Sequence, residues 1–154
     1  MTTIIQGSQL RKLLFGNIVT RAAAALPQTA QSAIFNVVGG DVLITSLVGE
    51  VTTAVQAQAT TVQIIGNPTT GTDVNWTNST GDINGKEIGS TVCLPAAFGG
   101  TALVQTAGGN GLSGIAYLAR VGTIDFKTGA SSTGAMKWYL TYVPLDDGAS
   151  VTAA

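Results

Sequence analysis

The sequence predicts an all-β fold, an antiparallel β-sandwich or jelly-roll-like domain with an N-terminal arm. Short runs of β-branched and aromatic residues recur from residue 33 onward, and breaks rich in glycine, asparagine or aspartate separate them. The chain has 20 glycines in 154 residues, which favours tight turns between strands. We therefore expect a β-sandwich domain over 33–154, preceded by an arm over 1–32.

The expected arm contains few turn signals. Its apolar stretches lie at 10–15 and 21–26, and Pro27 marks a boundary after the second stretch. It could form a short amphipathic helix or an extended segment, and the alternatives are a poorly ordered terminus or a first strand. Residues 1–40 carry three basic side chains and no acidic one, so the arm is basic while the rest of the chain is mildly acidic.

The β domain is expected to contain nine strands, each of a length that suits a strand better than a helix. They lie at 33–38, 41–48, 51–58, 61–65, 89–94, 102–105, 114–121, 123–127 and 135–143. The segment 51–58 could also be a helix, because alanine and glutamine favour one, but its threonines weigh towards a strand.

The last of these strands has the clearest alternation. Met136, Trp138, Leu140 and Tyr142 share one face, which period two assigns to the core. Pro144 then ends the hydrogen-bonded pairing, because proline has no N–H to donate.

The composition leaves few residues for catalysis. The chain has no histidine, one cysteine, and 7 basic and 8 acidic side chains. Chemistry near neutral pH usually needs a titrating imidazole, a thiolate, clustered carboxylates or a metal. We expect Cys93 to be a small buried side chain and the pair Asp146 and Asp147 to form a turn. The sequence thus predicts no enzyme, with no catalytic residue, metal, cofactor or small-molecule substrate.

The segment 73–87 is the one stretch dense in oxygen ligands. Asp73 begins an alternation typical of a calcium loop, but asparagines occupy the positions of the required glycine and closing acid. We expect a polar surface loop. Trp76 within it could stack on a sugar or contact a partner protein, and the alternative is an aromatic lid at the sandwich edge.

Neither a membrane nor nucleic acid is an expected partner. The sequence contains no apolar run of 18 residues, and Arg21 interrupts the stretch that could resemble a secretory signal. The net charge is −1, and the basic residues of the β domain are scattered.

Low charge and high hydrophobicity together predict association. Hydrophobic residues make up 45% of the chain and charged residues 10%, so other protein is expected to cover part of the surface. We expect an obligate oligomer or a subunit of a larger assembly, with the arm contacting its neighbours. The expected partner-binding residues are Leu10, Arg11, Lys12, Leu13, Leu14, Phe15, Arg21 and Trp76.

Two groups of segments resemble a family of small virion structural proteins of tailed bacteriophages. The first is GEVTTAVQAQATT at 49–61, with NPT at 67–69 and GTDV at 71–74. The second is GTID at 122–125, with ASSTGAMKW at 130–138 and a strand that ends in VPL at 143–145. The resemblance implies a virion component, above all a capsid decoration (cement) protein, and it transfers no functional site.

The expected function is therefore to stabilise a tailed-phage head by bridging subunits of the major capsid protein. The resemblance also implies a homotrimer whose arm contacts the shell or a neighbouring copy. Such a protein would be made in the cytoplasm of the bacterial host and reside on the capsid surface. The alternatives are a tail-tube, fibre or head-fibre protein, or a sugar-binding β module that uses Trp76 or Tyr117 as its platform.

Overall fold

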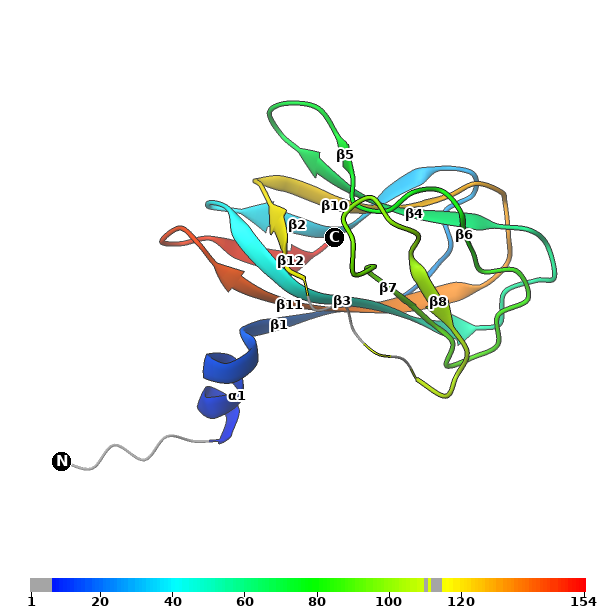
Figure 1. Cartoon of the computed structure of the whole chain (residues 1–154), viewed down its shortest axis with the longest axis horizontal. Coiled ribbons are helices and arrows are strands. Elements are labelled where there is room, and N and C mark those ends of the chain that lie inside the picture. The colour runs from blue at the N-terminus through cyan, green and yellow to red at the C-terminus, as the bar shows by residue number, and fades with distance from the viewer. Residues whose placement is uncertain (1–6, 110, 112–114) are drawn as a thin grey trace.

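The computed structural model confirms the all-β prediction, with two antiparallel sheets packed face to face (Figure 1). The structure describes residues 7–109, 111 and 115–154. Its elements are α1 (Gly7–Phe15), β1 (Asn17–Ala25), β2 (Gln31–Val38), β3 (Val42–Thr53), β4 (Thr61–Pro68), β5 (Val74–Asn75), β6 (Gly81–Asp82), β7 (Thr91–Cys93), β8 (Leu103–Gln105), β9 (Tyr117–Ala119), β10 (Gly122–Thr128), β11 (Ala135–Pro144) and β12 (Ser150–Ala153).

The two sheets have six strands each. Sheet A has the order β1-β11-β3-β7-β8, and β9 also pairs with β3. Sheet B has the order β12-β2-β10-β4-β5, and β6 also pairs with β4. Both sheets are antiparallel, and the long strands β11, β3, β10 and β4 form their centres.

The core lies between the sheets, as the alternation in the last long strand predicts. Met136, Trp138, Leu140 and Tyr142 of β11 are all buried, and the residues between them are half-buried. The Trp138 ring packs edge-on against Phe126 of β10, with 4.9 Å between ring centroids. This contact joins the central strands of the two sheets.

One expected break between strands is wrong. The sequence predicts separate strands at 41–48 and 51–58, but the structure has the continuous strand β3, which ends at Thr53. Gly49 does not turn the chain. Its missing side chain leaves room for the Trp138 ring, because a Cβ at residue 49 would lie 2.7 Å from that ring. Residues 54–58 then leave the sheet, and the N–H of Val55 bonds to the carbonyl of Lys86.

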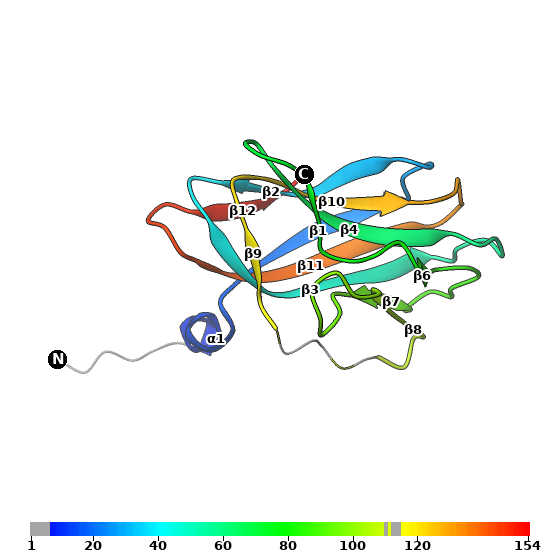
Figure 2. The ribbon, with the colours of Figure 1, turned by 45° about the horizontal axis from the view of Figure 1, so that its top comes forward.

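The described residues 7–25 of the expected arm form two elements, α1 and β1. Helix α1 stands clear of both sheets on the sheet A side of the molecule (Figures 1 and 2). β1 is an edge strand of sheet A, paired with β11 from Asn17 opposite Tyr142 to Ala25 opposite Ala135. The sandwich therefore includes β1 and begins at Asn17. β1 can form there because β11 is long enough to pair with a further strand along its free edge.

The remaining strands follow the sequence pattern with shifted ends. The expected strand at 114–121 begins outside the described residues, and its described part contains the short β9. Three short or peripheral strands, β5, β6 and β12, carry no alternation of their own that would predict them. They form because the long strands of sheet B offer them unpaired edges.

We expect Gly49→Ala to destabilise the fold by about 1–3 kcal/mol, since the new methyl overpacks the site filled by Trp138. The control is Gly108→Ala, where a Cβ meets no atom within 4 Å. Urea unfolding midpoints of the two variants measure the difference. Equal midpoints would show that the Trp138 ring does not depend on this glycine.

Candidate functional site

The described residues contain no cluster of three or more His, Cys, Asp or Glu side chains that could hold a metal ion. The carboxylates of the expected polar loop contact separate neighbours. Asp73 accepts from the Gln31 side chain, whereas Asp82 accepts the backbone N–H groups of Thr60 and Asn84. Only the contact between Asp82 and Asn84 lies within a turn, and the other two join the segment to distant residues. The expected polar surface loop is correct only in part, because the segment contains β5 and β6 and buries Trp76, Thr77 and Ile83.

Two further sequence expectations agree with the structure. Cys93 is buried in β7. The segment with Asp146 and Asp147 forms a turn, in which the Asp146 carboxylate accepts the backbone N–H of Asp41 at 2.7 Å.

Helix α1 carries the largest exposed apolar side chains of the expected arm. Leu10, Leu14 and Phe15 are 49–66% exposed, and Lys12 is exposed in the last turn. The side chains of Arg11 and Leu13 lie outside the described part of the chain. A hydroxyl in β3, that of Thr45, lies 3.4 Å from the carbonyl oxygen of Phe15 and ties the helix end to sheet A.

An apolar row crosses the outer face of sheet A near the end of this helix. Val143 of β11, Leu43 of β3 and Leu118 of β9 are successive cross-strand neighbours. Val143 and Leu118 are exposed, and Leu43 is half-buried. We call these three residues the sheet A apolar row. Exposed Ile18 of β1 extends it, because Ile18 pairs with Thr141, two residues before Val143.

Arg21 lies in the sandwich instead of projecting from an arm. Its Nε donates to the backbone carbonyl oxygen of Ala154 at 3.1 Å, and the residue is half-buried. Because Arg21 is in β1 and Ala154 follows β12, this bond ties an edge strand of sheet A to an edge strand of sheet B.

The structure favours the second of the two roles considered for Trp76, an aromatic lid at the edge of the sandwich. It is 2% exposed, its ring lies against Gly66, and its centroid is 5.5 Å from that of Tyr117. This burial favours the aromatic lid over a sugar-stacking platform, because stacking needs an open ring face. Tyr117 is buried as well, and its hydroxyl donates to the carbonyl of Pro95 at 2.9 Å.

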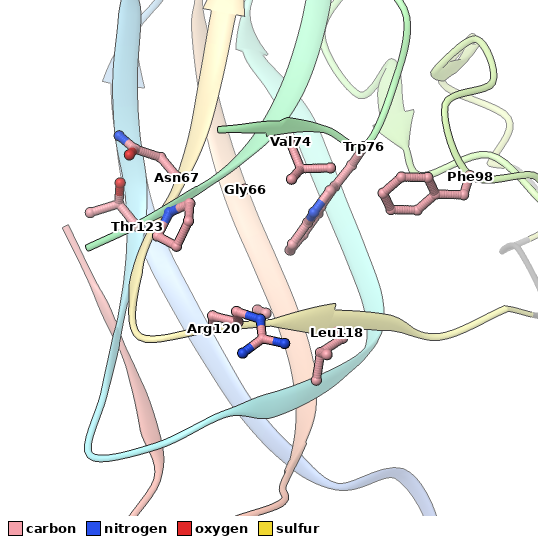
Figure 3. Close-up of a pocket in the computed structure, with 10 residues that line it drawn as sticks. Gly66, Asn67, Val74, Trp76, Phe98, Leu118, Arg120 and Thr123 are labelled. Carbon is pink, nitrogen blue, oxygen red and sulfur yellow. The ribbon is translucent and has the colours of Figure 1, made fainter. Parts of the chain in front are cut away.

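A pocket of about 200 Å³ opens beside Trp76, between β4 and β5 of sheet B and β9 of sheet A (Figure 3). We call it the Trp76 pocket. It is lined by Gly66, Asn67, Pro68, Val74, Trp76, Phe98, Leu118, Ala119, Arg120 and Thr123. Figure 3 shows the indole projecting into this space from one side and Arg120 and Leu118 lying across from it.

Sequence reasoning did not find this pocket. Its walls come from 66–76, from Phe98 and from 118–123, which are far apart in the chain. No local pattern links them. A partial signal was the presence of Trp76 in an otherwise polar segment.

No family model, curated protein or solved structure matches the chain. Within the described residues, no helix is both long and apolar enough to cross a membrane. The candidate functional surfaces are thus defined by the geometry of α1, the sheet A apolar row and the Trp76 pocket.

We expect Trp76→Ala to cost about 3–5 kcal/mol of unfolding free energy, as truncation of a buried aromatic side chain usually does. The exposed Ile88 provides the control, and Ile88→Ala should change stability by about 0.5 kcal/mol or less. Guanidinium unfolding of both variants measures the effect. Similar unfolding free energies for Trp76→Ala and Ile88→Ala would contradict the burial of Trp76.

The unfolding free energy should fall as the pH rises above about 10. Burial raises the pKa of the Tyr117 hydroxyl above its ordinary value of 10.0. The folded state therefore holds this proton more tightly than the unfolded state does. The stability that this difference contributes is complete below pH 10.0 and is lost as the pH rises through the pKa of Tyr117 in the folded state.

The test compares wild type with Tyr117→Phe by urea unfolding at neutral and alkaline pH. At neutral pH the variant should lose about 1 kcal/mol, because the Pro95 carbonyl loses its donor. Its stability should then decline less steeply with pH than that of wild type. Parallel declines would exclude Tyr117 as a source of the alkaline loss.

Proposed function

We propose that this chain is a structural protein of a tailed-phage virion, a capsid decoration protein that stabilises the head by bridging subunits of the major capsid protein. The observation that carries the proposal is the unburied apolar side of α1, beside the sheet A apolar row. A chain whose sandwich already buries its own core has no internal use for these side chains.

The length of α1 supports an intermolecular role. The helix has nine residues, and isolated helices shorter than about 12–15 residues are marginal in water. Since α1 stands off the sandwich, packing against its own sheets does little to stabilise it (Figure 2). An amphipathic helix of this kind gains its stability by laying its apolar side into a groove of another protein.

The position of α1 also supports self-association as a homotrimer. Gly16 joins the helix to β1 with φ of 89°, and a Cβ there would collide with the carbonyl oxygen of Tyr142. The joint therefore directs α1 away from the body, which leaves the helix available to a neighbouring copy. Closed cyclic symmetry lets each copy cover the apolar surface of the next.

The resemblance to phage virion proteins supports the same class of function. The resembling segments cover parts of β3, β10 and β11, the ends of β4, the first residue of β5, and the connections at 54–60 and 130–134. α1 and the loops around Phe98 lie outside them, so the resemblance carries over no partner contact there.

The double variant Leu10→Gln with Leu14→Gln should weaken binding to phage heads about tenfold or more. Burial of one leucine contributes about 1.5–3 kcal/mol, and about 1.4 kcal/mol corresponds to tenfold in affinity. The fold should be unaffected, because both side chains are exposed. Binding is measured by co-sedimentation with heads of the encoding phage that lack this protein.

The matched control is Ile88→Gln, whose side chain is 62% exposed on a loop far along the chain from α1. It should bind heads as wild type does. Light scattering of wild type should give three times the 15.5 kDa of one chain. A monomer that ignores such heads would overturn the proposal, and electron microscopy showing the copies along a tail would favour the tail-tube or fibre alternative.

A further inference from the structure

The Trp76 pocket has the size and walls of a site for one ring-sized apolar group. Its volume is about 200 Å³, and an apolar cavity of about 150 Å³ is enough to bind benzene. Val74, Trp76, Phe98 and Leu118 supply apolar walls (Figure 3). Trp76 is itself buried, so it forms the inner wall of the pocket.

The rim of the pocket is also apolar and open to solvent. Val74, Phe98 and Leu118 are 44–59% exposed and come from three separate segments. A small molecule inside the pocket would leave most of this rim uncovered. A pocket that accepts one anchor, surrounded by contacts that exclude water, is the usual anatomy of a protein-binding hot spot.

Arg120 gives the pocket its charge, because it is the one charged residue among the described lining residues. Its side chain is 66% exposed and lies 3.7 Å from the Asp41 carboxylate. An exposed pair at that distance is weak, so guanidinium donors are available to a second carboxylate. Charge complementarity therefore favours an acidic group on the partner, next to the group that enters the pocket.

Two short edge strands flank the site. Among the described residues, β5 pairs with β4 and β9 pairs with β3, so each has one edge without a partner strand. Such edges can add main-chain hydrogen bonds to an extended segment of another protein.

We propose that the Trp76 pocket binds an extended segment of a partner protein, with an aromatic side chain in the pocket and an adjacent carboxylate on Arg120. The inference rests on the proposed function only in taking the partner to be a protein. The pocket shares no residue with helix α1, although its rim residue Leu118 also belongs to the sheet A apolar row. It differs from α1 in chemistry, and it can be tested without phage heads.

The experiment is an NMR titration of the full chain, labelled with nitrogen-15, with the dipeptide acetyl-Phe-Asp-amide. The chain has two tryptophans, so two indole N–H signals report on binding. The Trp76 signal should shift, and that of Trp138 should not, because Trp138 packs in the core against Phe126. Peptide at about 10 mM suffices, since ligands of this size bind in the millimolar range.

Two further dipeptides separate the ring from the charge. Acetyl-Ala-Asp-amide should produce no shift, because it leaves the pocket empty. Acetyl-Phe-Asn-amide should bind about 2–5-fold more weakly than acetyl-Phe-Asp-amide, the range expected for a solvent-exposed ion pair. In Arg120→Gln the two phenylalanine peptides should bind equally, whereas in the control Lys127→Gln, on another exposed base, the difference should remain.

The proposal is overturned if acetyl-Phe-Asp-amide fails to shift the Trp76 signal or shifts both indole signals alike. Equal binding of the alanine and phenylalanine peptides would overturn the aromatic anchor. A preference for aspartate that survives Arg120→Gln would overturn the charge pairing. Because none of these measurements uses phage heads, failure here is distinct from failure of the decoration function.

Discussion

The packing of Trp138 on Phe126 across the sandwich is the contact on which the other features depend. It joins the central strands β11 and β10, and it requires Gly49 in the neighbouring strand β3. Away from this central contact, the two sides of the sandwich are arranged differently. At one edge Arg21 ties β1 to the segment after β12, and at the other the shorter strands leave the Trp76 pocket between them.

The surfaces proposed for function lie outside this core and have different chemistry. α1 is basic and apolar, and its described apolar side chains Leu10, Leu14 and Phe15 are exposed. The Trp76 pocket is preformed, because Trp76 and Tyr117 are buried and pack together. The two surfaces are separate, so the bridging function that we propose would let α1 and the Trp76 pocket act on two neighbours at once.

Sequence reasoning was accurate where the period of side chains decides the structure. β11 alternates with large side chains on the core face, so its strand and its buried residues were predictable. It failed at β3, where two strands were predicted at 41–48 and 51–58, although Gly49 continues the strand and makes room for Trp138. It also left β1 as one of several options for the arm, because an alanine-rich segment has little strand preference of its own.

The amino-acid sequence by itself determined the fold class, the core face of the long strands and the poverty of catalytic groups, because these follow from composition and local periodicity. Only the tertiary structure decided that Trp76 is buried, that Arg21 binds the segment after β12, and that Phe98, Leu118 and Arg120 meet at one pocket. These facts depend on which strand edges lie side by side, and that pairing joins residues too far apart in the chain for a local pattern to reveal.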